Sequence, residues 1–291
     1  MRYDFPMKRK LGLVLAGGGG NGAYQMGVWK RLSESGITER ISVISGTSVG
    51  ALNAALFATT PTERAESVWT RGISGKILVP QKSTSRTLGT ALSALLGGEA
   101  DGSEILRSAV RLASNGVWSR SGLEEIIRKT DLARLSVGGT PAVYATCFAL
   151  LPLLGTRHFC LNSLPTDTVR KILLATSAIP LAFKPESVGG VLYYDGGLSC
   201  NVPLAPLVRE RCTDAIVVHL SQTERISGDV PDSMCVLEIR PSVRLSKSGV
   251  LDFSQSHAER LIETGYADCG RVLEHQALIS PKKEPFSFAQ A

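Results

Sequence analysis

A serine between two glycines follows a short β-branched segment of the chain. The segment Gly46-Thr47-Ser48-Val49-Gly50 fits the pattern G-x-S-x-G, which puts a nucleophilic serine on a sharp turn between a strand and a helix. The glycines let the chain reverse without a Cβ clashing against the returning backbone. Three fixed positions in five also occur by chance in ordinary turns. The pattern predicts that the Ser48 hydroxyl is the nucleophile of an acyl-transfer reaction.

A second glycine-rich segment follows the first apolar segment and reads Gly17-Gly18-Gly19-Gly20-Asn21-Gly22. Backbone N–H groups in such a loop can converge on one point, and the helix that follows adds partial positive charge. The loop therefore predicts an oxyanion hole, in which one donor is worth on the order of 10²–10³ in turnover. The same glycines fit the dinucleotide pattern G-x-G-x-x-G. No acidic residue ends the second predicted strand, so a nucleotide site is disfavoured.

A third motif, Asp195-Gly196-Gly197, ends another apolar segment. An aspartate before two glycines is usually only a turn. Beside an activated serine it becomes a candidate base, although an unperturbed carboxyl pKa of about 3.9 makes it a weak base in water. Apolar neighbours such as Tyr193 and Tyr194 would raise that pKa and improve the match to a hydroxyl.

Histidines and cysteines show no catalytic or metal-ligand pattern. His219 lies late in the apolar segment 215–220 and is predicted to be a satisfied core residue. The other histidines are His158, His257 and His275. The six cysteines form no C-x-x-C pair, as expected of free thiols in a reducing compartment. We expect no metal and no cofactor. We also expect ester hydrolysis to survive the loss of any single histidine, because Ser48 and Asp195 would act as a pair.

Strands and helices that could position these motifs alternate along the chain. Strands are predicted at 11–16, 41–45, 141–151, 157–161, 191–194, 215–220 and 236–240, and helices at 23–32, 51–59, 62–71, 88–96, 121–130, 167–175 and 251–276. This alternation predicts an α/β fold with a mainly parallel sheet. The apolar tip of the hairpin at 141–161 is expected to be buried, with lipid contact as the alternative. The helix at 88–96 is expected to pack on the core, with a mobile lid as the alternative.

Composition limits the function further. The chain has 291 residues, 43% of them hydrophobic and 20% charged, which predicts a globular protein. The formal net charge of +6 suits an acidic surface such as anionic lipid, and we find no motif for specific nucleic-acid recognition. No segment approaches the roughly 20 apolar residues needed to cross a bilayer. We expect a cytoplasmic protein whose membrane contact, if any, is peripheral. The oligomeric state is left open.

The three motifs, in this order, resemble those of the patatin-like phospholipase family. Residues 175–180, Ala-Thr-Ser-Ala-Ile-Pro, are similar to the family's A-x-S-A-x-P stretch. The resemblance covers 11–220, and 221–291 is expected to pack on the same domain. It implies a three-layer α/β/α sandwich and phospholipase A-type hydrolysis of lipid esters by a Ser48–Asp195 dyad without a metal. The oxyanion donors it implies are the N–H groups of Gly18, Gly19 and Gly20.

Asn21 departs from the family pattern, in which an arginine or lysine is usual. Asn21 can donate a hydrogen bond but carries no charge, so we expect reduced or substrate-restricted activity. Two alternatives remain open. One is a non-catalytic lipid- or nucleotide-binding protein on the same fold. The other is acyl transfer to an acceptor other than water, since one acyl-enzyme serves both outcomes.

Overall fold

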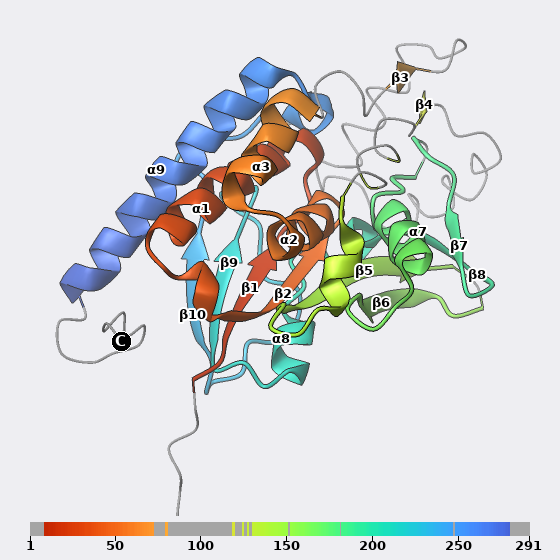
Figure 1. Cartoon of the computed structure of the whole chain (residues 1–291), viewed down its shortest axis with the longest axis horizontal. Helices are drawn as coiled ribbons and strands as arrows, with labels where there is room; N and C mark the ends of the chain where they lie inside the picture. Colours follow the sequence, from red (N-terminus) through yellow and green to blue (C-terminus); the bar gives the residue numbers. More distant parts are fainter. Residues whose placement is uncertain are drawn as a thin grey trace, which may run out of the picture.

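A computed structural model describes residues 9–72, 79–80, 118–119, 124, 127, 130–150, 152–180, 182–246 and 248–279. Within them the chain forms a sheet of eight strands with helices on both sides, and a separate two-stranded ribbon, β3 (Val79–Pro80) with β4 (Trp118–Ser119) (Figure 1). The helix expected at 88–96 lies outside the described residues, as does most of the one expected at 121–130.

The main sheet is mostly parallel. The strand order is β10-β9-β1-β2-β5-β8-β7, and β6 lies along β5. The pairs β5–β6, β5–β8 and β7–β8 are antiparallel, and the other pairs are parallel. The strands are β1 (Leu11–Leu15), β2 (Ile41–Thr47), β5 (Ala142–Ala149), β6 (Gly155–Cys160), β7 (Glu186–Val188), β8 (Val191–Asp195), β9 (Asp214–Val218) and β10 (Cys235–Ile239). Every residue of β1 and β9 is buried, as parallel strands covered on both faces require.

Helices cover this sheet. They are α1 (Ala23–Glu34), α2 (Val49–Thr59), α3 (Thr62–Ser67), α7 (Thr166–Thr176), α8 (Ala205–Arg209) and α9 (Gln255–Ile279), and short 3₁₀ turns occur at η1 (Gly19–Gly22) and η6 (Ser248–Leu251). The long helix α9 lies along α1 (Figure 1). A Cβ at Gly265 would lie 2.1 Å from the Tyr24 carbonyl oxygen, so the two helices pack closely through a glycine. None of the described helices is both long enough and apolar enough to cross a membrane.

Most predicted elements are confirmed, including the mainly parallel three-layer architecture. The short elements β7 and α8 carry no strong periodicity and were not predicted, and α9 begins at Gln255 rather than at 251. The expected burial of the β5–β6 tip is wrong, since Leu153 and Leu154 are 43% and 52% exposed. The reason is geometric: the pairing of β5 with β8 ends at Ala149, and the tip projects beyond it.

Candidate active site

Ser48 alone forms the turn between β2 and α2. Its backbone has φ 53° and ψ −126°, a conformation that a non-glycine residue adopts only when its surroundings impose it. Gly46 and Gly50 permit the turn, because a Cβ at Gly46 would lie 2.3 Å from the Gly50 carbonyl and one at Gly50 would lie 2.2 Å from the Leu15 carbonyl oxygen. The Ser48 N–H donates to Thr176 Oγ1 (2.9 Å). The strained serine is therefore held in place from α7.

Asp195 reaches Ser48 because β2 and β8 share one edge of β5. Thr47, at the end of β2, pairs with Thr146, and the next residue of β5, Cys147, pairs with Asp195 at the end of β8. β6 occupies the other edge of β5 along 144–149. A strand has only two edges, so β2 and β8 lie end to end along the same one. This arrangement brings Asp195 to the carboxyl end of β2.

The Asp195 carboxylate is buried and hydrogen-bonded. It is 6% exposed and accepts the Gly197 N–H at Oδ1 (2.8 Å), and the Ser48 side chain is close enough to act on its pKa. Burial raises the Asp195 pKa to about 6, while the Gly197 N–H and the Ser48 side chain lower it. The expected rise is therefore confirmed in direction. A carboxylate with this pKa is a better proton acceptor near neutral pH than one in water.

The glycine loop lies beside the serine, since a Cβ at Gly17 would lie 3.3 Å from Ser48 Cβ. The Gly17 N–H donates to the Asn201 carbonyl (3.2 Å), and the Asn21 N–H donates to the Gly18 carbonyl (3.2 Å). The sequence places both residues among the candidate oxyanion donors 17–22, but their N–H groups already donate to backbone carbonyls. The N–H groups of Gly18, Gly19 and Gly20 precede the first bond of η1, and no acceptor within the described chain receives them.

Asn21 is 4% exposed and contacts the C-terminal part of the chain. Its Nδ2 donates to the Ser246 carbonyl (3.3 Å), and its Oδ1 lies 3.3 Å from His257 Nε2. The ring of His257 continues to Arg260, whose Nη2 lies 2.9 Å from Nδ1. Asn21 is thus linked to the guanidinium of Arg260 through the imidazole ring of His257.

Two further residues support the site and were not predicted. Asn201 Nδ2 donates to the Gly17 carbonyl (3.1 Å) and to Glu224 Oε1, so it holds the start of the glycine loop. Thr176 Oγ1 accepts the Ser48 N–H and donates to the Thr146 carbonyl. Thr176 lies in the A-x-S-A-x-P stretch, which could have drawn attention to it. Asn201 follows Asp195 by six residues, and its local sequence signals only a turn.

All four histidines lie within the described residues, and none of them hydrogen-bonds to Ser48 or Asp195 there. His219 is fully buried, with Nε2 2.6 Å from Glu238 Oε2. Its Nδ1 faces Glu224 Oε2 at 3.8 Å without a hydrogen bond, so the prediction of a satisfied core histidine holds for one ring nitrogen only.

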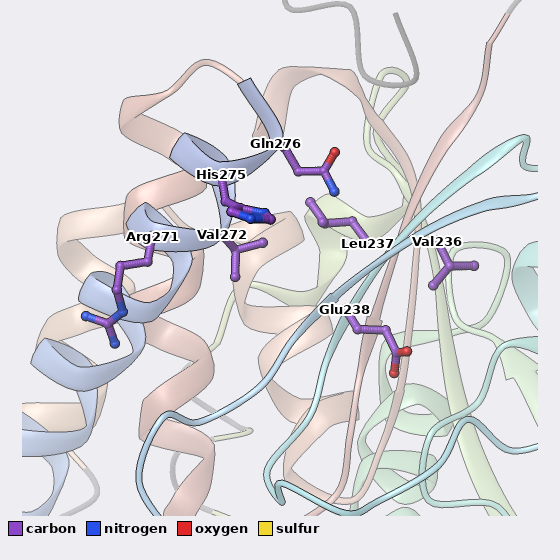
Figure 2. A pocket seen from close by; sticks show the side chains of 7 residues that line it. All are labelled: Val236, Leu237, Glu238, Arg271, Val272, His275 and Gln276. Carbon is purple, nitrogen blue, oxygen red and sulfur yellow. The ribbon is translucent and has the colours of Figure 1, made fainter. Parts of the chain in front are cut away.

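A surface groove of about 530 Å³ lies elsewhere, between the edge strand β10 and the C-terminal half of α9 (Figure 2). Its lining is Val236, Leu237, Glu238, Arg271, Val272, His275 and Gln276. None of these residues belongs to the serine turn, the glycine loop or the β8 end, so the groove is separate from the candidate active site.

A strained serine at a sharp strand–helix turn is the nucleophile elbow of serine hydrolases. The family model of patatin-like phospholipases matches residues 13–208. The chain belongs to the patatin-like phospholipase family.

Relatives share short segments with this chain. A lysophospholipase of Aspergillus terreus, nte1, is 56% identical over 50 residues, which are 17% of this chain and 3% of that protein. A patatin-like phospholipase domain-containing protein of Caenorhabditis elegans is 41% identical over 68 residues, 22% of this chain and 5% of its own length. The chain thus matches only a small part of these relatives. The crystal structure of VipD from Legionella pneumophila shares the fold, with a TM-score of 0.50 and 13% identity over 93% of this chain and 67% of that one.

Proposed function

We propose that this protein hydrolyses carboxylic esters of phospholipids or lysophospholipids through Ser48 and Asp195. The observation that carries the proposal is the meeting of the strained Ser48 turn with the buried Asp195 at neighbouring residues of β5, where burial raises the carboxyl pKa to about 6 and Ser48 acts on it. Family membership and the lysophospholipase relatives support a lipid ester as the substrate class.

The proposed reaction is an acyl transfer in two halves. Ser48 Oγ attacks the ester carbonyl carbon while its proton moves to Asp195. The N–H groups of Gly18, Gly19 and Gly20 stabilise the oxyanion that forms. The intermediate collapses to an acyl-serine, and the leaving alcohol takes the proton from Asp195. Water then attacks the acyl-serine with Asp195 as base, which releases the fatty acid and restores Ser48.

Peripheral contact with a lipid surface is part of the proposal. The exposed tip residues Leu153 and Leu154 lie near Leu192, 44% exposed, whose carbonyl accepts the Leu150 N–H (2.8 Å). Arg157 donates to the Leu153 carbonyl (3.2 Å), which places a cation beside the leucines. The tip follows the carboxyl end of β5, the same sheet edge as Ser48. Leucines beside a cation suit an anionic bilayer.

The hydrolysis is tested with defined phospholipids and lysophospholipids, with products read by mass spectrometry. Wild-type protein is expected to release fatty acid, and Ser48→Ala and Asp195→Asn are each expected to abolish release. Labelling of Ser48 by a fluorophosphonate reports the nucleophile independently of the lipid. Absence of both labelling and turnover would favour the lipid-binding alternative, and appearance of acyl groups on an added lysolipid would favour transfer.

The surface contact is tested by sedimentation with phosphatidylserine–phosphatidylcholine vesicles. Leu153→Asp with Leu154→Asp is expected to reduce vesicle binding and vesicle hydrolysis, while hydrolysis of a monomeric short-chain ester remains. Val208→Asp is the matched control, because Val208 is an apolar residue on α8 that is 37% exposed. It lies at the opposite edge of the sheet, where Lys10 donates to the nearby Glu210. Equal binding by both variants would reject this surface.

A further inference from the structure

His257 and Asn21 form a buried polar contact between α9 and the glycine loop. His257 Nε2 lies 3.3 Å from Asn21 Oδ1, and the two residues are 5% and 4% exposed. Water therefore cannot readily replace either partner, so loss of one leaves the other unsatisfied. The contact joins residues 236 positions apart in the chain.

The partners of His257 define its protonation. A guanidinium has only donors, so the 2.9 Å contact of Arg260 Nη2 requires His257 Nδ1 to accept. Nε2 then carries the proton and donates to Asn21 Oδ1. The charged groups that act on the ring are Asp252, with Oδ2 3.6 Å from Nδ1, and Arg260. Burial lowers the His257 pKa, Asp252 raises it and Arg260 lowers it, with a net lowering that favours the neutral ring.

The glycine loop packs against the same C-terminal segment without free space. A Cβ at Gly19 would lie 2.1 Å from the Val250 carbonyl oxygen, and one at Gly20 would lie 2.0 Å from the Asp252 carbonyl oxygen. A Cβ at Gly249 would lie 2.5 Å from Asn21 Oδ1. A shift of Asn21 against this segment must therefore also move the neighbouring N–H groups.

We propose that His257 is a positioning residue for the oxyanion donors. Its Nε2–H fixes Asn21, and through Asn21 it fixes the N–H groups of Gly18, Gly19 and Gly20. The inference rests on the proposed hydrolysis. It gives His257 no proton to transfer, because the ring contacts Asn21 and not Ser48 or Asp195.

The kinetic test compares two substitutions on a monomeric ester. His257→Leu removes the donor and keeps the bulk, and it is expected to lower kcat at least about tenfold with KM within about twofold, because oxyanion donors act in the transition state. His257→Gln can still donate to Asn21 but cannot act as a base, and it is expected to restore kcat to within about threefold of wild type. Asn21→Leu combined with His257→Leu is expected to be no slower than either single variant. His275→Leu, on the same helix, is the control and is expected to be unchanged.

Three results would overturn the inference: a glutamine variant as slow as the leucine variant, a loss confined to KM, or additive losses in the double variant. A readout independent of turnover is the ¹⁵N shifts of the histidine rings, assigned by comparison with His257→Gln. An Nε2-protonated neutral ring is expected, and an Nδ1-protonated ring would reject the contact. If wild-type protein turns over no ester, the proposed function fails and the role of His257 fails with it, whatever the ring shifts show.

Discussion

At the scale of single residues, the Asp195 carboxylate is buried beside the Ser48 turn. A buried carboxylate is less stable as an anion than one in solution, which is the origin of its raised pKa. The raised pKa suits Asp195 to the base role that we propose for it, and the same raised pKa is a cost to folding. Activity and stability therefore respond to pH in opposite directions around this one group.

The rate of the proposed hydrolysis should depend on the ionisation of Asp195. Only the carboxylate accepts the Ser48 proton, so kcat/KM for a neutral monomeric ester is expected to rise with pH through about 6 and then level off. Initial rates across pH 4–9 measure this profile. A profile that is flat down to pH 4 would contradict the assignment of Asp195 as the base.

The contribution of Asp195 to the stability of the protein should change with pH in the opposite direction. The native Asp195 pKa of about 6 exceeds the ordinary value of 3.8, so the native state binds more protons between these values, and this group's contribution to stability falls as pH rises through that window. Asp195→Asn is expected to raise the free energy of unfolding above pH 6, by up to about 3 kcal/mol. The gain should shrink toward pH 4. Denaturant unfolding at pH 4 and pH 8 makes the comparison, with Asp167→Asn on the exposed start of α7 as control.

At the scale of elements, β5 is the template on which the site is assembled. One edge of β5 pairs first with β2 and then with β8. The pairing partner changes from β2 to β8 between Thr146 and Cys147. Gly196, directly after β8, packs on this junction, because a Cβ there would lie 2.3 Å from the Thr146 carbonyl oxygen. The end of β8 thus needs a residue without a side chain.

Gly196→Ala is therefore expected to displace Asp195 from Ser48. We expect ester hydrolysis to fall at least about tenfold and unfolding to become easier by about 1–3 kcal/mol, the usual cost of overpacking. Gly138→Ala is the control, since nothing lies within 4 Å of a Cβ there. Rates and denaturant midpoints of the two variants decide the point, and equal behaviour would show that the junction tolerates a methyl group.

Local patterns predicted the serine turn, the glycine loop and the aspartate, because each motif is contiguous and has a steric reason for its glycines. They could not predict that Cys147 pairs with Asp195, since strand order is a property of the folded sheet. They also placed Gly17 among the donors, because its N–H has the same local character as those of its neighbours. Only the position of Asn201 shows that this N–H is already used.

At the scale of the whole molecule, the C-terminal segment supports a site whose motifs all lie before it. The family match ends at residue 208, whereas η6 and α9 follow and contact the glycine loop and α1. Tyr24 Oη donates to Asp268 (3.0 Å) across the two helices. The packing of α9 on α1 therefore contributes to stability and, on our proposal, to the position of the oxyanion donors.

Separating α9 from α1 should lower both properties together. Gly265→Ala would place a methyl group 2.1 Å from the Tyr24 carbonyl oxygen, and we expect a lower Tm and a lower kcat. Gly270→Ala on the same helix is the control, because its nearest neighbour is Arg31 Nε at 3.4 Å. Thermal unfolding and initial rates measure both effects. A normal kcat in a destabilised Gly265→Ala protein would separate the helix packing from the site.

The end-to-end seating of β2 and β8 on β5 has a consequence for changes in chain length. Side chains alternate between the two faces of a strand, so one residue inserted within 192–194 would turn the carboxylate to the far side of the sheet. An insertion at Gly189 and Gly190, which are exposed and have positive φ in the β7–β8 connection, would leave that alternation intact. Homologous chains should accordingly vary in length at this connection. The number of residues between the connection and the aspartate should stay constant.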